Sequence, residues 1–109
     1  MSEGAIRKIS DLIDSTYPVN LNPEAWRWRR CAKVVEEAGE VVEALLGLTG
    51  ENPRKGVTHT ENDLVLELLD VALASLGAVA HLMPASVDPL DLLEDQADMV
   101  LNRLEEALD

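Results

Sequence analysis

Aromatic residues are scarce in this sequence. Of its 109 residues 47% are hydrophobic but only 3% are aromatic, and there is no Phe. A core without large rings has to be built from Leu, Val, Ala and Ile, which suits helix-on-helix packing. We therefore predict an all-α fold in a single domain spanning 1–109. A domain this small buries a modest fraction of its surface, so we also expect partner subunits.

Cysteine is scarce too, since Cys31 is the only one. A single thiol excludes an internal disulfide and a cysteine-based zinc site, and we expect it to be a small buried apolar residue. The first residues carry several charges, so we do not expect a secretory leader. The longest apolar stretch is interrupted by Glu67 and Asp70. We therefore expect no membrane span and predict a cytoplasmic protein.

Basic residues are few, with 9 Lys and Arg against 21 Asp and Glu, for a formal net charge of −12. A protein that binds a nucleic acid backbone needs Lys and Arg in excess on some face, so we expect no nucleic acid partner. An acidic protein can still bind a small phosphorylated molecule when a divalent cation lies between its carboxylates and the phosphates.

Hydrophobic spacing together with start and stop signals predicts four helices, over 4–15, 22–47, 60–82 and 88–108. Tyr17-Pro18 ends the first helix, and Pro84 ends the third. Asn22 caps the second helix, while Thr60 and Asp63 have the spacing of a capping box at the start of the third. The composition between 47 and 60 indicates a loop of lid length.

The second and third predicted helices differ in how their acidic residues are distributed. In the second, four glutamates share the face opposite an apolar arc, an arrangement typical of a solvated surface: Glu36, Glu37, Glu40 and Glu43. In the third, Glu67 and Asp70 are the only charged residues between Leu64 and Ala80. Such a helix is expected to be buried on most sides, which would place both acids in or beside the interior.

Buried carboxylates need a compensating positive charge, because an ionised acid in an apolar setting costs several kcal/mol. No Lys or Arg lies within the third helix, so a bound metal is the simpler account. Oxygen-only ligands favour Mg²⁺, with Mn²⁺ as the other candidate. Glu37 and Glu40 have the same offset as Glu67 and Asp70, so two facing helices could each present two carboxylates. A second metal, or Lys33 with Arg30, could offset the remaining charge.

Two motifs carry a resemblance to a known family. Glu36-Glu37-Ala38-Gly39-Glu40 is an EExxE motif, and after the 26 residues 41–66 comes an ExxD motif, Glu67-Leu68-Leu69-Asp70. Their order and gap resemble the all-α nucleoside triphosphate pyrophosphohydrolase superfamily, which includes MazG, over roughly residues 20–105. The resemblance implies a four-helix MazG-like bundle completed by oligomerisation, as a homodimer or homotetramer.

The resemblance also implies a reaction and a set of residues. Members of the family hydrolyse a nucleoside triphosphate between the α and β phosphates, releasing a nucleoside monophosphate and pyrophosphate, which suits housecleaning of the nucleotide pool. The expected metal ligands are Glu37, Glu40, Glu67 and Asp70. Glu36 would be an accessory catalytic acid, and we add Lys33 as a second catalytic candidate.

Six further residues are candidates for substrate binding: Trp26, Arg30, Arg54, Lys55, Asn102 and Arg103. Trp26 projects to the side of Glu37 and could stack on a base, although packing is the commoner role of a Trp. The two basic residues of the 47–60 loop could close over phosphates or be solvated. The last two lie in a helix where family members carry polar or basic residues.

One rival function belongs to another class. The chain could be a noncatalytic helical oligomerisation module, in which buried Glu and Asp residues pair with arginines across a subunit interface. A ferritin-like di-iron bundle is not expected, because neither His59 nor His81 has a Glu three residues before it.

Overall fold

The computed structural model describes residues 4–16 and 22–109. Four helices and no strand are found in these ranges, which confirms the all-α class: α1 Ala5–Thr16, α2 Pro23–Thr49, α3 Glu61–Leu82 and α4 Pro89–Leu108. The stop that the sequence predicts at Tyr17-Pro18 lies outside the described residues.

The predicted start signals cap α2 and α3. The Asn22 side chain accepts a hydrogen bond of 2.8 Å from the Ala25 N–H. At α3 both bonds of the capping box form, between Thr60 and Asp63. Helix α2 runs past the predicted end at Gly47 and stops before Gly50, whose φ of 68° is the left-handed conformation that glycine adopts without strain.

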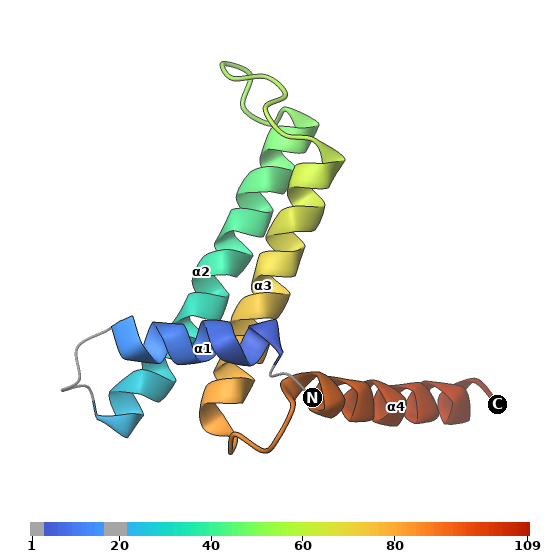
Figure 1. Ribbon diagram of the computed structural model, residues 1–109. Coiled ribbons are helices and arrows are strands. Elements are labelled where there is room, and N and C mark those ends of the chain that lie inside the picture. The colour runs from blue at the N-terminus through green and yellow to red at the C-terminus, as the bar shows by residue number, and fades with distance from the viewer. Residues whose placement is uncertain (1–3, 17–21) are drawn as a thin grey trace.

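Helices α2 and α3 form a long antiparallel pair joined by the 50–60 loop at one end (Figure 1). Helix α1 crosses this pair near its other end, and α4 extends away from it. The radius of gyration is 17.4 Å, whereas a compact chain of this length has about 13 Å. The four helices of one chain therefore do not close into a compact bundle by themselves.

The hydrophobic core of the described residues is small. Its buried apolar side chains are Ala44, Ala78 and Ala80. We expected α3 to be buried on most sides, and within one chain this is wrong, since Leu66 and Leu69 are about half exposed at 52% and 53%. The reason is that α2 and α1 cover only part of the circumference of α3 (Figure 1).

Cys31 also departs from its prediction. We expected a buried apolar residue, but Cys31 is exposed, and the side chains grouped with it, Trp28, Ala32 and Val35, all belong to α2 itself. Helix α3 is long and apolar enough to cross a membrane by length and composition alone, a property that the core helix of a soluble protein shares.

Buried polar side chains attach α1 to the end of α3. The Arg7 guanidinium donates hydrogen bonds to the carbonyl oxygens of Ala80, Pro84 and Val87, at 3.2, 3.2 and 2.8 Å. These bonds satisfy a carbonyl group at the C-terminal end of α3 that has no partner within the helix. They also hold the segment from which α4 starts, so the direction of α4 is tied to α1.

Candidate metal centre

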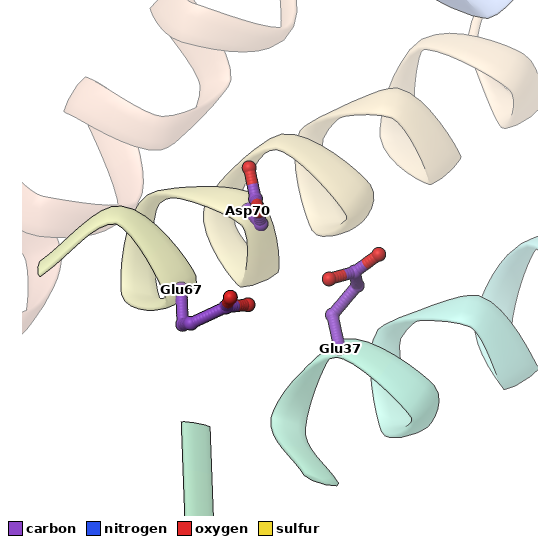
Figure 2. A group of neighbouring side chains, drawn as sticks. All are labelled: Glu37, Glu67 and Asp70. Atoms are coloured by element: carbon purple, nitrogen blue, oxygen red, sulfur yellow. The ribbon is translucent and has the colours of Figure 1, made fainter. Parts of the chain in front are cut away.

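Three carboxylates meet between α2 and α3. Glu37 projects from α2, and Glu67 and Asp70 project from α3 toward it (Figure 2). One oxygen from each of the three lies within 4.8 Å of the others. The two motifs face each other because α2 and α3 are antiparallel and are joined by the 50–60 loop. The structure thus brings together three of the four predicted metal ligands.

Two oxygens of this cluster are buried without a hydrogen-bond donor. Glu37 Oε2 and Glu67 Oε2 have no partner among the described residues. A buried acceptor left in this state costs about 1–3 kcal/mol, and more when it is charged. A cation between the carboxylates would remove that cost. The donor set of oxygens alone, without His or Cys, fits Mg²⁺ or Mn²⁺.

Asp70 is exposed, which differs from the interior position that we expected for it. Within one chain α4 extends away from the α2–α3 pair and leaves α3 open to solvent (Figure 1). The cluster therefore has a buried side, at Glu37 and Glu67, and an open side at Asp70. An open side is what a ligand needs to approach a metal held by protein carboxylates.

Glu40, the fourth predicted ligand, lies next to Glu37 and Glu67. A hydrogen bond with Glu37 raises the pKa of Glu40, and the negative charges of Glu37 and Glu67 raise it further. Glu40 is outside the group of three whose oxygens lie within 4.8 Å of one another. Its pKa nevertheless responds to both helices, so without a cation this carboxylate is destabilised by its neighbours.

Lys33 lies one turn before the cluster and contacts it. Its ammonium group is 3.3 Å from Glu37 Oε1 and 3.2 Å from Glu36 Oε1. The hydrogen bond to Glu36 raises the pKa of Lys33, which stays protonated at neutral pH. Both candidate catalytic residues therefore lie beside the carboxylate cluster. Glu36 has a side chain that is 62% exposed, so it is accessible to water.

A cavity of about 680 Å³ extends from the carboxylate cluster between α1, α2 and α3. Glu37 and Asp70 belong to its lining at one end, and Gly77 and Arg30 at the other. The other apolar or small side chains of the lining are Ile9, Ile13, Trp28, Ala32, Leu73 and Ala74. Sequence reasoning missed the contribution of α1. The apolar spacing of residues 4–15 indicates that one face of α1 packs against the protein, but it does not indicate which helices that face contacts.

Arg30 has a structural partner in addition to its place in the lining. Its Nη2 donates to Asp14 Oδ1 at 2.9 Å and to the backbone oxygen of Ser10 at 2.7 Å, and its side chain is 7% exposed. Asp14 also lies 3.1 Å from Nδ1 of His81. Burial raises the pKa of Asp14, but its contacts with Arg30 and His81 outweigh this effect, so the pKa lies below the usual value. The charge of Arg30 is therefore matched inside the protein.

The two tryptophans differ in environment. The Trp26 ring lies 5.8 Å from the His81 ring, centroid to centroid, and Trp26 is not part of the cavity lining. Trp28 is 75% exposed and belongs to the lining of the cavity. Of the two, the structure places Trp28 rather than Trp26 where a ligand in the cavity would meet it.

The remaining predicted residues lie elsewhere in the chain. Arg54 and Lys55 are exposed in the loop at the end of the α2–α3 pair, and Asn102 and Arg103 are exposed on α4 (Figure 1). The Arg103 Nε–H donates to the Met99 carbonyl of its own helix at 3.5 Å. Within one chain the structure does not bring these four residues to the carboxylate cluster.

No protein-family model, curated protein or solved structure matches this chain. The function must therefore be inferred from the carboxylates, the cavity beside them and the two motifs.

Proposed function

We propose that this protein is a Mg²⁺-dependent nucleoside triphosphate pyrophosphohydrolase. It would hydrolyse a standard or modified nucleoside triphosphate between the α and β phosphates, giving a nucleoside monophosphate and pyrophosphate, and so clear the nucleotide pool. The observation that carries the proposal is the meeting of Glu37, Glu67 and Asp70 from facing helices, with two buried oxygens that have no donor. The EExxE and ExxD motifs, which resemble those of MazG-like enzymes, supply these residues.

Glu37, Glu67 and Asp70 would hold the metal, with Glu40 as a fourth ligand. Mn²⁺ is the other ion that this oxygen donor set accepts. The ion supplies Lewis acidity, which withdraws charge from phosphate oxygens and makes water more acidic. The carboxylates contribute by fixing where that positive charge lies, because their helices are rigid and packed against each other.

The candidate catalytic residues act around this centre. Glu36 is exposed beside it and can accept a proton from the attacking water. Lys33 is protonated and contacts Glu36 and Glu37, so its charge can stabilise the negative charge that develops on the bridging oxygen as the phosphoanhydride breaks. Neither step needs a nucleophilic side chain.

Homo-oligomerisation is part of the proposal, as a homodimer or homotetramer that completes a MazG-like bundle. Large apolar side chains are exposed on all four helices, including Leu12 on α1, Val42 on α2, Leu69 on α3 and Leu104 on α4. A second copy offers the same unpaired faces, so association would bury apolar surface on both chains at once. We also propose a cytoplasmic location without a membrane partner, because Glu67 and Asp70 interrupt the longest apolar stretch, and no nucleic acid partner, because the composition is acidic.

The rival proposal is a noncatalytic oligomerisation module. Among the described residues, Arg30 and Asp14 form a partly buried pair, but it lies within one chain and does not include Glu67 or Asp70. Glu67 and Asp70 have no ion pair with a basic residue in the part of the chain that the structure describes. A compensating charge for the buried oxygen of Glu67 would come from an ion or from another chain.

The test is a panel of standard and modified nucleoside triphosphates incubated with Mg²⁺, with the products identified by chromatography. We expect a monophosphate and pyrophosphate in equal amounts, and no activity after removal of divalent ions with a chelator. Release of inorganic phosphate instead would contradict cleavage between the α and β phosphates. If none of the compounds is cleaved while Mg²⁺ fails to bind in calorimetry, the oligomerisation module is the better account.

A further inference from the structure

We infer that the Lys33 ammonium takes the place of a second metal ion, so that the carboxylate cluster holds one divalent ion per chain. The inference rests on the proposed function, because it fixes how many ions the proposed metal centre binds. From the sequence, the charge left over beside one ion could be offset either by a second metal or by Lys33 with Arg30. The contacts of these two basic residues distinguish the possibilities.

The two oxygens of Glu37 have different surroundings. Its Oε1 lies 3.3 Å from Lys33 Nζ, whereas its Oε2 is buried and has no partner among the described residues. Glu67 Oε2, on the facing helix, is buried in the same way. A carboxylate can contact two cations at once, because each of its oxygens is an acceptor. Glu37 therefore has one oxygen held by the ammonium and one oxygen left for an ion.

Lys33 contacts a second carboxylate at the same time. Its Nζ lies 3.2 Å from Glu36 Oε1, so oxygens of Glu36 and Glu37 converge on one cationic atom. An ammonium group has three N–H donors, so one donor remains for water or for a phosphate. Lys33 belongs to the lining of the cavity and its side chain is 52% exposed, so a ligand can approach it.

Arg30 does not share this role. Its Nη2 donates to Asp14 and to Ser10 of α1. In the ranges 4–16 and 22–109, no ion pair joins Arg30 to the carboxylate cluster. The positive charge that contacts the cluster in this structure is therefore that of Lys33.

An exposed ion pair between residues one turn apart on a helix usually contributes little. The pair of Lys33 with Glu37 differs, because the Glu37 side chain is only 14% exposed and its charge is screened less by solvent. Without the ammonium, Glu36 and Glu37 would lose the basic group that contacts both. Two oxygens that already converge on one point would then be available to a second divalent ion, which takes oxygen ligands of this kind.

The test counts the ions bound in the absence of nucleotide. After treatment with a chelator, the full chain is titrated with Mn²⁺, followed by electron paramagnetic resonance, and with Mg²⁺, followed by calorimetry. Lys33→Gln removes the ammonium and keeps a polar side chain that suits a helix. Lys8→Gln is the matched control, because Lys8 is an exposed lysine of α1 outside the cavity lining and its loss changes the net charge equally.

We expect one ion per chain in the wild type and in Lys8→Gln, and two in Lys33→Gln over the same range of ion concentration. The first ion should bind Lys33→Gln about tenfold more tightly than the wild type, the factor that Coulomb's law gives for an ammonium a few ångströms from a divalent ion in water. Adding Glu36→Gln to Lys33→Gln should return the count to one, because the second ion loses a ligand. If Lys33 only stabilised its helix, none of these counts would change.

The outcomes separate the inference from the proposed function. Two ions per chain in the wild type, or one in Lys33→Gln, would overturn the inference, while pyrophosphate release by the wild type would still support the hydrolase. The expected counts without cleavage of any triphosphate would overturn the hydrolase and keep the centre of one ion and one ammonium. If neither the wild type nor Lys33→Gln binds a divalent ion, both are wrong, and the carboxylates are better explained as partners of basic residues on a second copy.

Discussion

Glu37 on α2 and Glu67 on α3 each turn one carboxylate oxygen into a buried space where no hydrogen-bond donor reaches it. The two acids come from motifs separated by the 26 residues 41–66, and only the antiparallel pairing of their helices brings them together. Two unsatisfied anionic oxygens at one place destabilise the protein without a cation. Cation binding and folding should therefore be linked.

The first prediction concerns this linkage. Mg²⁺ should raise the melting temperature at neutral pH, because it binds the folded chain and removes the repulsion among Glu37, Glu67 and Asp70. At a hundredfold excess over its dissociation constant, the stabilisation should be about 2.7 kcal/mol. Thermal denaturation with and without the ion measures it, with equal ionic strength of Na⁺ as the control. An unchanged melting temperature at saturating Mg²⁺ would rule out the site.

The second prediction separates catalysis from stability. Glu67→Gln and Asp70→Asn keep the shape of the side chains but remove a negative ligand, so Mg²⁺ affinity and pyrophosphate release should both collapse. The metal-free fold should survive or gain stability, because a repelling charge is gone. Asp95→Asn, an exposed acid on α4, is the matched control and should change neither property.

The opposite result would favour the oligomerisation module. If Glu67 or Asp70 were paired with an arginine of another chain, its amide variant would leave that guanidinium buried and unpaired, at a cost of about 3–5 kcal/mol. Retained turnover together with a much lower melting temperature would therefore count against the metal centre.

The third prediction uses the raised pKa of Glu40. Without metal, the folded chain holds a proton on Glu40 at a pH where the unfolded chain has released it, so the free energy of unfolding should fall as the pH rises through that raised pKa. Denaturant titrations of the metal-free protein from pH 4 to 8 measure this, with Glu40→Gln as the comparison. The variant should show a flatter profile, and an equal slope in both proteins would mean that Glu40 does not feel its neighbours.

The sequence predicted the features of this structure that depend on interactions between neighbouring residues better than those that depend on contacts between distant segments. Asn22, Thr60 and Asp63 act within one turn of chain, so the helix starts could be read from residue spacing alone. The carboxylate cluster followed from the two motifs and the resemblance they carry. The cavity did not, because its wall from α1 depends on where Ile9 and Ile13 pack, which is a contact between distant segments.

Arg30 is a second case in which a contact with a distant segment could not be predicted from the sequence. Its helical position relative to Glu37 suggested a role at the substrate, but its guanidinium is bound by Asp14 and Ser10 of α1. A helical projection gives the direction of a side chain, but it does not identify the residues of other helices that the side chain contacts. The burial expected for α3 within one chain was wrong for a related reason. An apolar helix is expected to be buried, but its sequence does not show whether the same chain or another chain buries it.

The fourth prediction concerns Asp14, which links α1 to Arg30 and His81. The pKa of Asp14 is lowered in the folded chain, so its contribution to stability is present above the ordinary value of about 3.9 and is lost as the pH falls through the lowered value. Asp14→Asn should destabilise the protein by about 1–3 kcal/mol at pH 7, reduced toward the lower end because the side chain is 35% exposed. The difference from the wild type should shrink below about pH 4. Denaturant titrations at pH 7 and pH 3 test this, and a difference of equal size at both would contradict the ion pair.

The last prediction concerns assembly. Helix α4 leaves the α2–α3 pair and exposes Leu93, Val100 and Leu104, while Val42 and Leu69 are exposed on the pair itself. The hydrogen bonds from Arg7 to the segment before α4 hold it in that direction, so a second copy is the nearest source of cover for both surfaces. We expect a dimer or tetramer at micromolar concentration in sedimentation velocity.

Leu104→Glu should shift this distribution toward monomer, because a charge placed in an apolar contact loses its hydration without gaining a partner. Glu105→Gln, on an exposed neighbouring position, should leave the mass unchanged. The melting temperature of the wild type should also rise with protein concentration, since folding and association are then coupled by mass action. A stable, active wild-type monomer with a melting temperature independent of concentration would show that the exposed leucines of α4 are not an interface and that one chain suffices for the site.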